Sequence, residues 1–494
     1  MGIPSLRHRH VNEHPVREGG DYVLYWMTAF RRPTFNFALQ HAIDRANQFN
    51  APLVILEAIR VRYRWASDRM HAFVIEGMRQ NAEYFSHYPV TYYPYVEPKP
   101  GHGTPLLHRL AKNAVTTVTD DYPCFFLPRM IDAVKERIPS RLELIDSNTI
   151  VPMRQADRTF TVAHSYRRWM QKQILEALAN SPRAEPLEEQ EIPSLSENAE
   201  RKIAAIQKKH SPADFSALID GDGLEDIPIE HDVKPSPVVQ GGYATARSLL
   251  QRFLKDHIDD YGDERNHPDE KATTGLSPHL HFGHISAHEV VHELLDHEDW
   301  TPNKASKPNG KNHGFWNTSE SAEGLLDQIL TWREMGFNMT HRHPDTYDRF
   351  DSLPEWAQKT LAEHGNDERP YLYSLEEFEE ARTHDDLWNA AQTELRENGI
   401  MHNYMRMLWG KKILHWTKTP HEALDIMEHL NNKYGLDGRD PNSYGGIFWV
   451  LGRYDRAWGP KRPIFGSVRY MTSDSTRKKL RLKKYLKRFG DDET

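Results

Sequence analysis

Short apolar runs alternate with amphipathic stretches over about the first 180 residues. Runs rich in β-branched and aromatic residues predict strands, and they cover Tyr22–Trp26, Leu53–Leu56, Val90–Tyr93 and Ala114–Thr119. Between them, apolar positions recur at helical spacing, as in Ala38–Gln48 and Ala72–Tyr88. Because strands that alternate with helices favour a parallel sheet, we predict a Rossmann-like α/β domain over residues 20–180.

The rest of the chain changes character twice. Residues 181–237 are rich in Pro, Glu, Ser and Asp, which is typical of a long interdomain connection. This connection contains one helical pattern, near Glu197–Lys209. From about Gly241 onward, one helical pattern follows another without a strand pattern between them. We therefore predict an all-α domain over residues 238–494.

Composition narrows the class of protein. The 494 residues carry a net charge of −8, and 27% of them are charged. No apolar run is long enough to span a bilayer and the N-terminus lacks a signal-peptide core, so we expect a cytoplasmic protein, nucleoid-associated if prokaryotic. The single cysteine, Cys124, cannot form an internal disulfide, and an iron–sulfur cluster would need several thiolates.

Cations concentrate near the C-terminus, although the total charge is negative. The segment Arg477–Arg488 is densely basic. Further cations precede it at Arg453, Arg456, Lys461, Arg462 and Arg469. Such a run is either a solvated helix face or a nucleic-acid-binding surface, and composition alone leaves both open.

Two segments carry candidate chemistry for a bound cofactor. Trp409 and Trp416 are seven residues apart, so on a helix they share a face about 10 Å apart along the axis, which suits core packing and also electron hopping. Ser277 is a good N-cap and Pro278 a good first helical residue. A helix N-terminus of this kind is able to bind a pyrophosphate, and no G-x-G-x-x-G or P-loop offers an alternative.

Several motifs, in order, resemble class II cyclobutane pyrimidine dimer photolyases of the photolyase/cryptochrome superfamily. They are His384–Gln392, Met401–Trp416, Asn431, Asp437–Asn442, Asp455–Trp458 and Pro463–Met471, with weaker matches at Val23–Met27 and Thr273–Gly283. Gly452-Arg453-Tyr454 departs from the usual class II text and is one residue shorter, and Ala29–Pro33 differs as well. The resemblance is therefore to a divergent class II-related branch.

The resemblance implies an α/β antenna domain followed by a helical domain that binds FAD, with FADH⁻ as the active form. The residues that it places at the cofactor are Tyr261, Arg265, Thr273, Thr274, Gly275, Leu276, Ser277, Arg406, Asp437, Gly438 and Asp455. In the family, the stretch that matches Thr273–Ser277 holds the FAD phosphates, with Tyr261 and Arg265 nearby. Arg406 and Asp437 would form an ion pair beside the isoalloxazine, and Arg265 and Asp455 a second salt bridge over it.

The family also implies an electron route and a lesion pocket. Trp409, Trp388 and Trp416 match the tryptophans that reduce the flavin in light, with Trp409 nearest to it. The predicted catalytic positions are Asn431 facing the flavin N5, Trp332 and Trp449 bracketing a flipped dimer, and Met407 lining the same pocket. Arg453, Arg456, Lys461 and Arg469 would contact DNA phosphates.

One catalytic position departs from the family. Gln328 stands where photolyases usually have a glutamate that hydrogen-bonds the thymine carbonyls. A glutamine amide donates a hydrogen bond but cannot supply a proton. We therefore expect repair of cyclobutane dimers in UV-damaged DNA that is retained but less efficient.

Three alternatives stay open. A cryptochrome-like photoreceptor would share the flavin and the tryptophans, and a (6-4) photolyase would need a histidine acid that the sequence does not place. The third is a zinc metallopeptidase, because His288-Glu289-Val-Val-His292 matches H-E-x-x-H. Leu295 occupies the glycine position of the metzincin continuation, and we expect no metal. We expect a monomer without an obligate protein partner, and the antenna pigment is unidentified, with none at all also open.

Overall fold

A six-stranded sheet organises the first part of the computed structural model, which describes residues 2–490. The strands are β1 (His8–His10), β2 (Tyr22–Met27), β3 (Leu53–Ile59), β4 (Thr91–Val96), β5 (Ala114–Asp120) and β6 (Leu142–Ile145). Their order across the sheet is β1-β6-β5-β2-β3-β4, and all neighbours are parallel except β1 and β6. The predicted α/β fold is confirmed.

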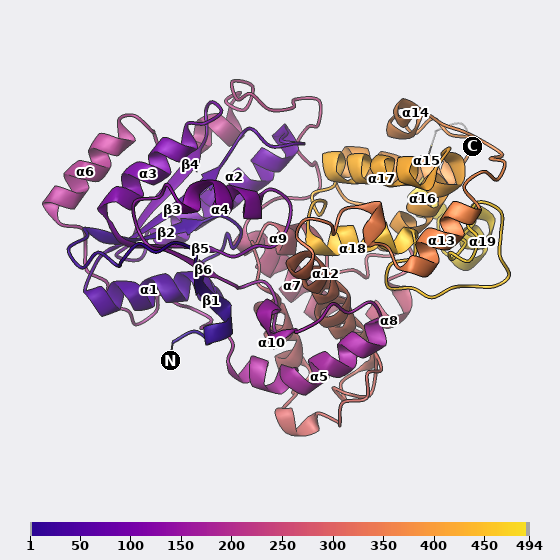
Figure 1. The fold of residues 1–494 in the computed structure, drawn as a ribbon, viewed down its shortest axis with the longest axis horizontal. Coiled ribbons are helices and arrows are strands. Elements are labelled where there is room, and N and C mark those ends of the chain that lie inside the picture. The colour runs from indigo at the N-terminus through magenta and orange to yellow at the C-terminus, as the bar shows by residue number, and fades with distance from the viewer. Residues whose placement is uncertain (1, 491–494) are drawn as a thin grey trace.

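Both faces of the sheet are buried at its centre, which explains why β2 and β3 are apolar at almost every position. In β2, Val23 and Tyr25 face a core that includes helix α1, whereas Leu24 and Trp26 face a core that includes α3 and α6. Figure 1 shows α1 on one side of the strands and α3 on the other. The helices of this half are α1 (Phe37–Phe49), α2 (Asp68–Phe85), α3 (Gly103–Asn113), α4 (Leu127–Lys135), α5 (Ala163–Ala179) and α6 (Glu197–Gln207).

The sequence patterns missed two strands. β6 is only four residues long and carries Glu143, a fully buried carboxylate that accepts hydrogen bonds from His41 and Arg45. β1 has the sequence His-Arg-His, which has no apolar residue. Both strands depend on pairing with segments that are distant in the sequence, and a local pattern cannot reveal such pairing.

Beyond β6 the described residues form no strand, as the pattern predicted. The helices there are α7 (Tyr243–Asp256), α8 (Tyr261–Glu264), α9 (Ser277–His281), α10 (Ala287–His297), α11 (Glu320–Leu326), α12 (Glu334–Arg342), α13 (Glu355–Glu363), α14 (Leu375–Glu379), α15 (Asp386–Asn398), α16 (Asn403–Trp416), α17 (Pro420–Tyr434), α18 (Pro441–Val450), α19 (Ser473–Lys479) and α20 (Lys483–Phe489). Short 3₁₀ or π turns cover Ser5–Arg7, Met153–Gln155, Ser216–Asp220, Pro302–Lys304, Asp327–Arg333 (η5) and Phe350–Ser352.

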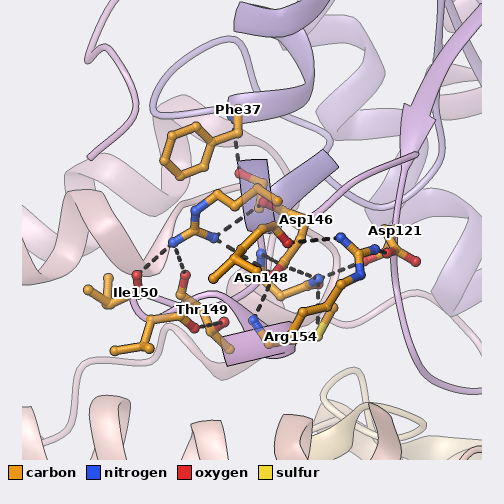
Figure 2. Close-up of polar contacts among 12 residues, drawn as sticks. Phe37, Asp121, Asp146, Asn148, Thr149, Ile150 and Arg154 are labelled. Atoms are coloured by element: carbon orange, nitrogen blue, oxygen red, sulfur yellow. Dashed lines mark hydrogen bonds and ion pairs between the residues drawn. The ribbon is translucent and has the colours of Figure 1, made fainter. Parts of the chain in front are cut away.

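A polar network fixes the chain as it leaves β6 toward the helices (Figure 2). Asp146 accepts hydrogen bonds from the backbone amides of Asn148 and Met153, at 3.0 and 2.9 Å. The buried Arg7 guanidinium donates to the carbonyls of Thr149 and Ile150, at 3.0 and 2.6 Å. These contacts satisfy buried backbone groups that belong to no helix or sheet.

Arg69 joins the two halves of the molecule. Its side chain extends from α2, is only 3% exposed, and donates to backbone carbonyls at the ends of α15 and α17. The acceptors are the carbonyl oxygens of Leu395, Arg396, Glu397 and Tyr434, together with that of Lys234 in the segment before α7. The last carbonyls of a helix lack partners within it, so one arginine satisfies the ends of two helices.

Candidate functional site

An ion pair connects α16 to the turn between α17 and α18. The Arg406 guanidinium donates to both carboxylate oxygens of Asp437, at 2.8 and 3.1 Å, so the expected pair is present. Arg406 also donates to the Asn431 side-chain oxygen at 3.3 Å, and the Asn431 amide donates to the Ser443 hydroxyl at 2.8 Å. Asn431 is thereby held in one orientation, and Arg406 remains partly exposed at the rim of the network.

The loop that precedes α9 contacts the same network. The Ser277 hydroxyl donates to Asp437 Oδ2 at 2.9 Å, although the two residues are 160 positions apart. The prediction that Ser277 is the N-cap is wrong: α9 begins at Ser277, and Leu276 precedes it without a side-chain cap. An N-cap hydroxyl accepts from a backbone amide, whereas the Ser277 hydroxyl is oriented to donate to a charged carboxylate, which makes a strong hydrogen bond.

Loop groups are available for a ligand at this position. Gly275 has φ +69°, and a Cβ added to it would meet nothing within 4 Å, so the backbone is open to close approach. Thr274 accepts the Leu276 amide at 3.2 Å, and Thr273 is exposed. Because α9 is only five residues long, an anion here would depend on these loop hydroxyls and amides more than on a helix dipole.

The second salt bridge expected over the cofactor, between Arg265 and Asp455, is wrong. Asp455 pairs instead with Arg469 at 2.9 Å, which lowers the pKa of the Asp455 carboxyl although burial opposes the shift. Arg265 lies over the ring of the buried Tyr261, 5.3 Å from its centroid. Asp455 and Arg469 are 14 residues apart, so closing the loop between them costs less entropy than the long connection to Arg265.

The three expected electron-carrying tryptophans are in contact and completely buried. Trp388 on α15 and Trp409 and Trp416 on α16 are each at most 2% exposed. Trp388 Nε1 donates to the Trp409 carbonyl at 3.0 Å, and its ring centroid is 6.1 Å from that of Trp416. Trp388 therefore connects the two tryptophans of α16, with Trp409 three residues after Arg406.

Two neighbours of this group were not identified from the sequence. Gln392 accepts the Trp409 indole N–H at 2.9 Å, and its position four residues after Trp388 on α15 would have placed it on the same face. The ring of Tyr373 is 5.7 Å from that of Trp416, but nothing in the local pattern indicates that contact.

The residues expected at the lesion pocket come from three elements that meet at α18. Gln328 and Trp332 lie on η5, Met407 on α16 and Trp449 on α18, and α18 packs against both other elements. Trp332 and Trp449 are half-buried, so each keeps part of its indole available. Trp332 Nε1 donates to Asp327 at 3.1 Å, which fixes the ring orientation.

The expected DNA-binding cations differ in availability. Arg453 is only 3% exposed and donates to the Tyr347 carbonyl at 2.8 Å, so its burial contradicts contact with DNA. Lys461 is exposed and pairs with Glu363 at 2.8 Å. Arg456 and Arg469 lie over the Trp458 ring, at 4.6 and 4.0 Å from its centroid.

The basic C-terminal segment is docked on the helical domain. Tyr485 and Phe489 of α20 are buried, and the Tyr485 hydroxyl donates to Glu394 at 2.9 Å. Arg477 pairs with Asp386, and Arg481 with Glu264. Part of this charge therefore serves the packing of the protein itself.

The H-E-x-x-H side chains of α10 are engaged in packing contacts. His288 Nδ1 and His292 Nε2 both lie within 3.3 Å of the Ser181 hydroxyl, and Glu289 accepts from Tyr243 and Thr34. Burial lowers the pKa of His288 and raises that of Glu289 to about 7. Within residues 2–490, the trio of possible metal ligands that converge is His8, His41 and Glu143, none of which belongs to α10.

A cavity of about 190 Å³ lies at the carboxyl ends of β2, β3 and β4. Its lining includes the aromatic rings of Trp26, Tyr63 and Phe126 from the α/β domain, and His281 of α9 lines it from the helical side. Arg31 and Glu97 also line it, so a planar ligand would find polar groups at its edge.

Sequence comparisons identify the family. A deoxyribodipyrimidine photo-lyase of Methanothermobacter thermautotrophicus is 32% identical over 98% of both chains, and one of Arabidopsis thaliana is 32% identical over 94% of this chain and 88% of its own. One of Potorous tridactylus is 28% identical over 92% of this chain and 79% of its own. No protein-family model matches. The chain belongs to the deoxyribodipyrimidine photo-lyase family, and it is an enzyme of that family.

A solved structure supports the fold independently. A bacterial class III photolyase from Agrobacterium tumefaciens matches with a TM-score of 0.60 over 95% of this chain and 86% of its own, at 14% identity. Among the described residues, no helix combines the length and apolar character needed to cross a membrane.

Proposed function

We propose that this enzyme is a class II-related photolyase that repairs cyclobutane pyrimidine dimers in UV-damaged DNA by light-driven electron transfer, with FAD as its cofactor. One observation carries the proposal: Arg406 belongs to the polar network with Asp437 and Ser277, and lies one turn before the buried Trp409 on the same helix. Two neighbouring positions of α16 would thus supply a charged group beside the flavin ring and the first tryptophan of the electron route.

The residues of the network suit a flavin. When bound in its reduced form, the flavin would supply the excited electron. Arg406 would face its negative charge with a donor held in advance, which is how a protein stabilises an anionic ring, and Asn431 would help to keep Arg406 in place through its side-chain oxygen. Asp437 orients Arg406 through two hydrogen bonds, and the loop before α9 would bind the phosphates.

The pocket residues suit a lesion that has left the base stack. Trp332 and Trp449 offer flat apolar surfaces from two different elements, and a dimer already weakened in its stacking costs less to extrude. Met407 would line the same pocket. Gln328 would donate its amide to a pyrimidine carbonyl, and Arg456, Lys461 and Arg469 would approach phosphates, so affinity should fall as salt rises.

A lesion-recovery assay tests the proposal directly. Purified protein, photoreduced beforehand, is mixed with dimer-containing oligothymidine and held under blue light or in darkness. Light-dependent return of the thymine absorbance band is the expected result. Flavin photoreduction without that recovery would favour the photoreceptor alternative, and a preparation without flavin would contradict both.

The aromatic cavity of the α/β domain is a candidate site for a second chromophore. We propose that it binds a planar aromatic pigment, because several aromatic rings line it, among them Trp26, Tyr63 and Phe126, and Arg31 and Glu97 supply polar contacts. The absorption spectrum of the purified protein should then contain a near-UV or blue band in addition to the flavin bands. A spectrum explained by flavin alone, unchanged after incubation with deazaflavin or folate, would contradict this assignment.

A further inference from the structure

Lys411 is a completely buried cation directly behind an expected wall of the lesion pocket. It extends from α16, is 0% exposed, and donates from Nζ to the Val450 carbonyl at 2.6 Å. The same ammonium lies 4.8 Å from the centroid of the Trp449 ring, within the range of a cation–π contact. Trp449 itself is half-buried, and the Arg469 guanidinium also lies over its ring, 5.5 Å from the centroid.

This charge has no counter-ion in direct contact. Among residues 2–490, no carboxylate lies within 4.0 Å of Lys411 Nζ, whereas the neighbouring Lys412 pairs with Asp385 at 3.1 Å. The Lys412 ammonium lies over the Trp416 ring. The two adjacent lysines therefore contact two different tryptophans, Trp449 and Trp416. The packing of α16 against α18 explains why Lys411 is enclosed: a Cβ added to Gly410 would come within 2.5 Å of Val450.

The surroundings of Lys411 bring the pKa of its ammonium close to neutral pH. Burial lowers its pKa to about 7, while Asp455 raises it and Arg469 lowers it. The Val450 carbonyl at the end of α18 and the Trp449 ring favour the charged form, since helix C-termini and aromatic faces attract cations. Burying an ammonium without a counter-ion costs free energy. Negative charge that comes close to the ammonium offsets this cost.

We propose that Lys411 is a positioning residue of the lesion pocket: it holds the Trp449 indole and places a positive charge behind it, to which the carbonyl-rich, electron-accepting dimer is complementary. The proposal rests on the proposed function, since it assumes that the dimer contacts Trp449. A charge in this enclosed position acts through a lower effective dielectric than a surface lysine does. Dimer binding should therefore favour the protonated form of Lys411.

Two consequences separate this role from simple packing. The preference for dimer-containing over undamaged DNA should fall as pH rises from about 6 to about 9, because Lys411 loses its proton in that range. Binding of the dimer should also be accompanied by proton uptake near pH 7.5, whereas undamaged DNA, which leaves the pocket empty, should cause less. The groups that face Lys411 and could alter this profile are Asp455 and Arg469.

The test uses the full-length flavoprotein in darkness, with dissociation constants from fluorescence anisotropy across that pH range. K411M should lose about five- to tenfold in the preference for dimer DNA and become independent of pH. K411R should keep the preference and lose the pH dependence, because a guanidinium stays charged. K412M serves as the control for binding, with an unchanged preference. Calorimetry in two buffers of different ionisation enthalpy measures the proton uptake.

The outcomes are distinguishable from failure of the proposed function. If the wild-type enzyme repairs dimers in light, but K411M keeps both its preference and its pH profile, Lys411 has no such role. If the wild-type protein does not repair dimers or prefer them in binding, the proposed function fails first. Should K411M fail to fold, a K411R profile that still follows pH as the wild type does would overturn the inference.

Discussion

Asp437 shows how a single side chain organises the candidate cofactor site. Its carboxylate accepts from Arg406 of α16 and from Ser277 of α9, so it joins two parts of the chain that approach each other only in the folded state. Hydrogen bonds between charged groups are worth more than neutral ones, and removing one partner leaves the other poorly satisfied. The positions of both Arg406 and the loop before α9 therefore depend on this residue.

The substitution Asp437→Asn should weaken flavin retention. An asparagine keeps the size of the side chain but loses the charge that holds Arg406, a change on the order of 1.5–3 kcal/mol at this contact. The ratio of flavin to protein absorbance after gel filtration measures the effect. Asp44→Asn is the matched control, because Asp44 also accepts from an arginine, Arg183, at 3.0 Å. Equal flavin content in all three proteins would contradict the assignment.

Gln328 is the residue at which repair efficiency should be adjustable. Restoring the carboxyl group with Gln328→Glu should raise the quantum yield of repair, since a carboxylic acid is able to supply a proton that an amide cannot. The yield per absorbed photon is compared at saturating dimer DNA, with the flavin fully reduced in both proteins. An unchanged yield would mean that Gln328 does not limit the reaction.

At the scale of elements, the contact between α15 and α16 places the tryptophans. The hydrogen bond from the Trp388 indole to the Trp409 carbonyl fixes the register of the two helices, and Gln392 of α15 fixes the Trp409 ring in return. The indole N–H groups of Trp388 and Trp409 are thus both paired although they are buried, as buried polar groups require. Helical spacing alone places Trp409 and Trp416 on one face of α16. Only the packing of α15 against α16 brings Trp388 into contact with both.

Trp388→Phe should slow photoreduction of the flavin in the absence of DNA. We expect a loss of about tenfold or more, equivalent to roughly 1.4 kcal/mol of added barrier, because the central carrier is removed. Dimer repair by chemically reduced enzyme should be unaffected. Trp300→Phe is a matched control, since Trp300 Nε1 also donates to a backbone carbonyl, that of Trp316, at 2.7 Å. Equal photoreduction rates in both variants would exclude this route.

The buried carboxyl group of Glu334 lies at another contact between elements and makes the free energy of unfolding depend on pH. It begins α12, is fully buried, and accepts from the Ile150 amide at 2.7 Å, next to the network of Figure 2. Burial raises its pKa to about 7 from an ordinary value of 4.5. The folded protein then binds this proton more tightly than the unfolded chain, so Glu334 makes the free energy of unfolding fall as pH rises from about 4.5 to about 7.

Glu334→Gln should remove that fall, because the amide cannot ionise and still accepts from Ile150. Urea unfolding on both sides of this pH range gives the difference between variant and wild type. Glu200→Gln, at an exposed position of α6, is the control. A wild-type pH dependence that persists in Glu334→Gln would assign the effect to another group.

At the scale of the whole molecule, Arg69 fastens the α/β domain to the helices. Its guanidinium reaches five carbonyls, and burial lowers its pKa to about 10. A Cβ added to Gly399, which ends α15 in the left-handed region, would come within 2.9 Å of the Arg69 side chain. The close approach of α2 to α15 thus depends on both residues.

Arg69→Met should destabilise the docking of the two halves. Removing the donor leaves buried helix carbonyls unsatisfied, at a cost on the order of 3 kcal/mol or more. Calorimetric unfolding and limited proteolysis should reveal a lower transition temperature and faster cleavage. Arg79→Met, on the exposed face of the same helix, should change little. Identical behaviour of the two variants would show that Arg69 does not hold the two halves of the molecule together.

The sequence by itself determined the elements whose patterns are local. The apolar runs of β2 to β5 and the helical periodicity after Gly241 follow from burial on both faces of a strand or on one face of a helix, and they were predicted correctly. The ordered motifs of the second half likewise indicated the family before any contact was known.

Tertiary structure alone decided which side chains meet. The sequence could not show that Ser277 would turn to Asp437, that Asp455 would pair with Arg469, or that Arg453 would be buried, because each outcome depends on competition among partners distant in the chain. The same holds for Lys411, which differs from Lys412 only in the helix face it occupies. Local propensity fixes an element, whereas packing between elements fixes the environment of each charge.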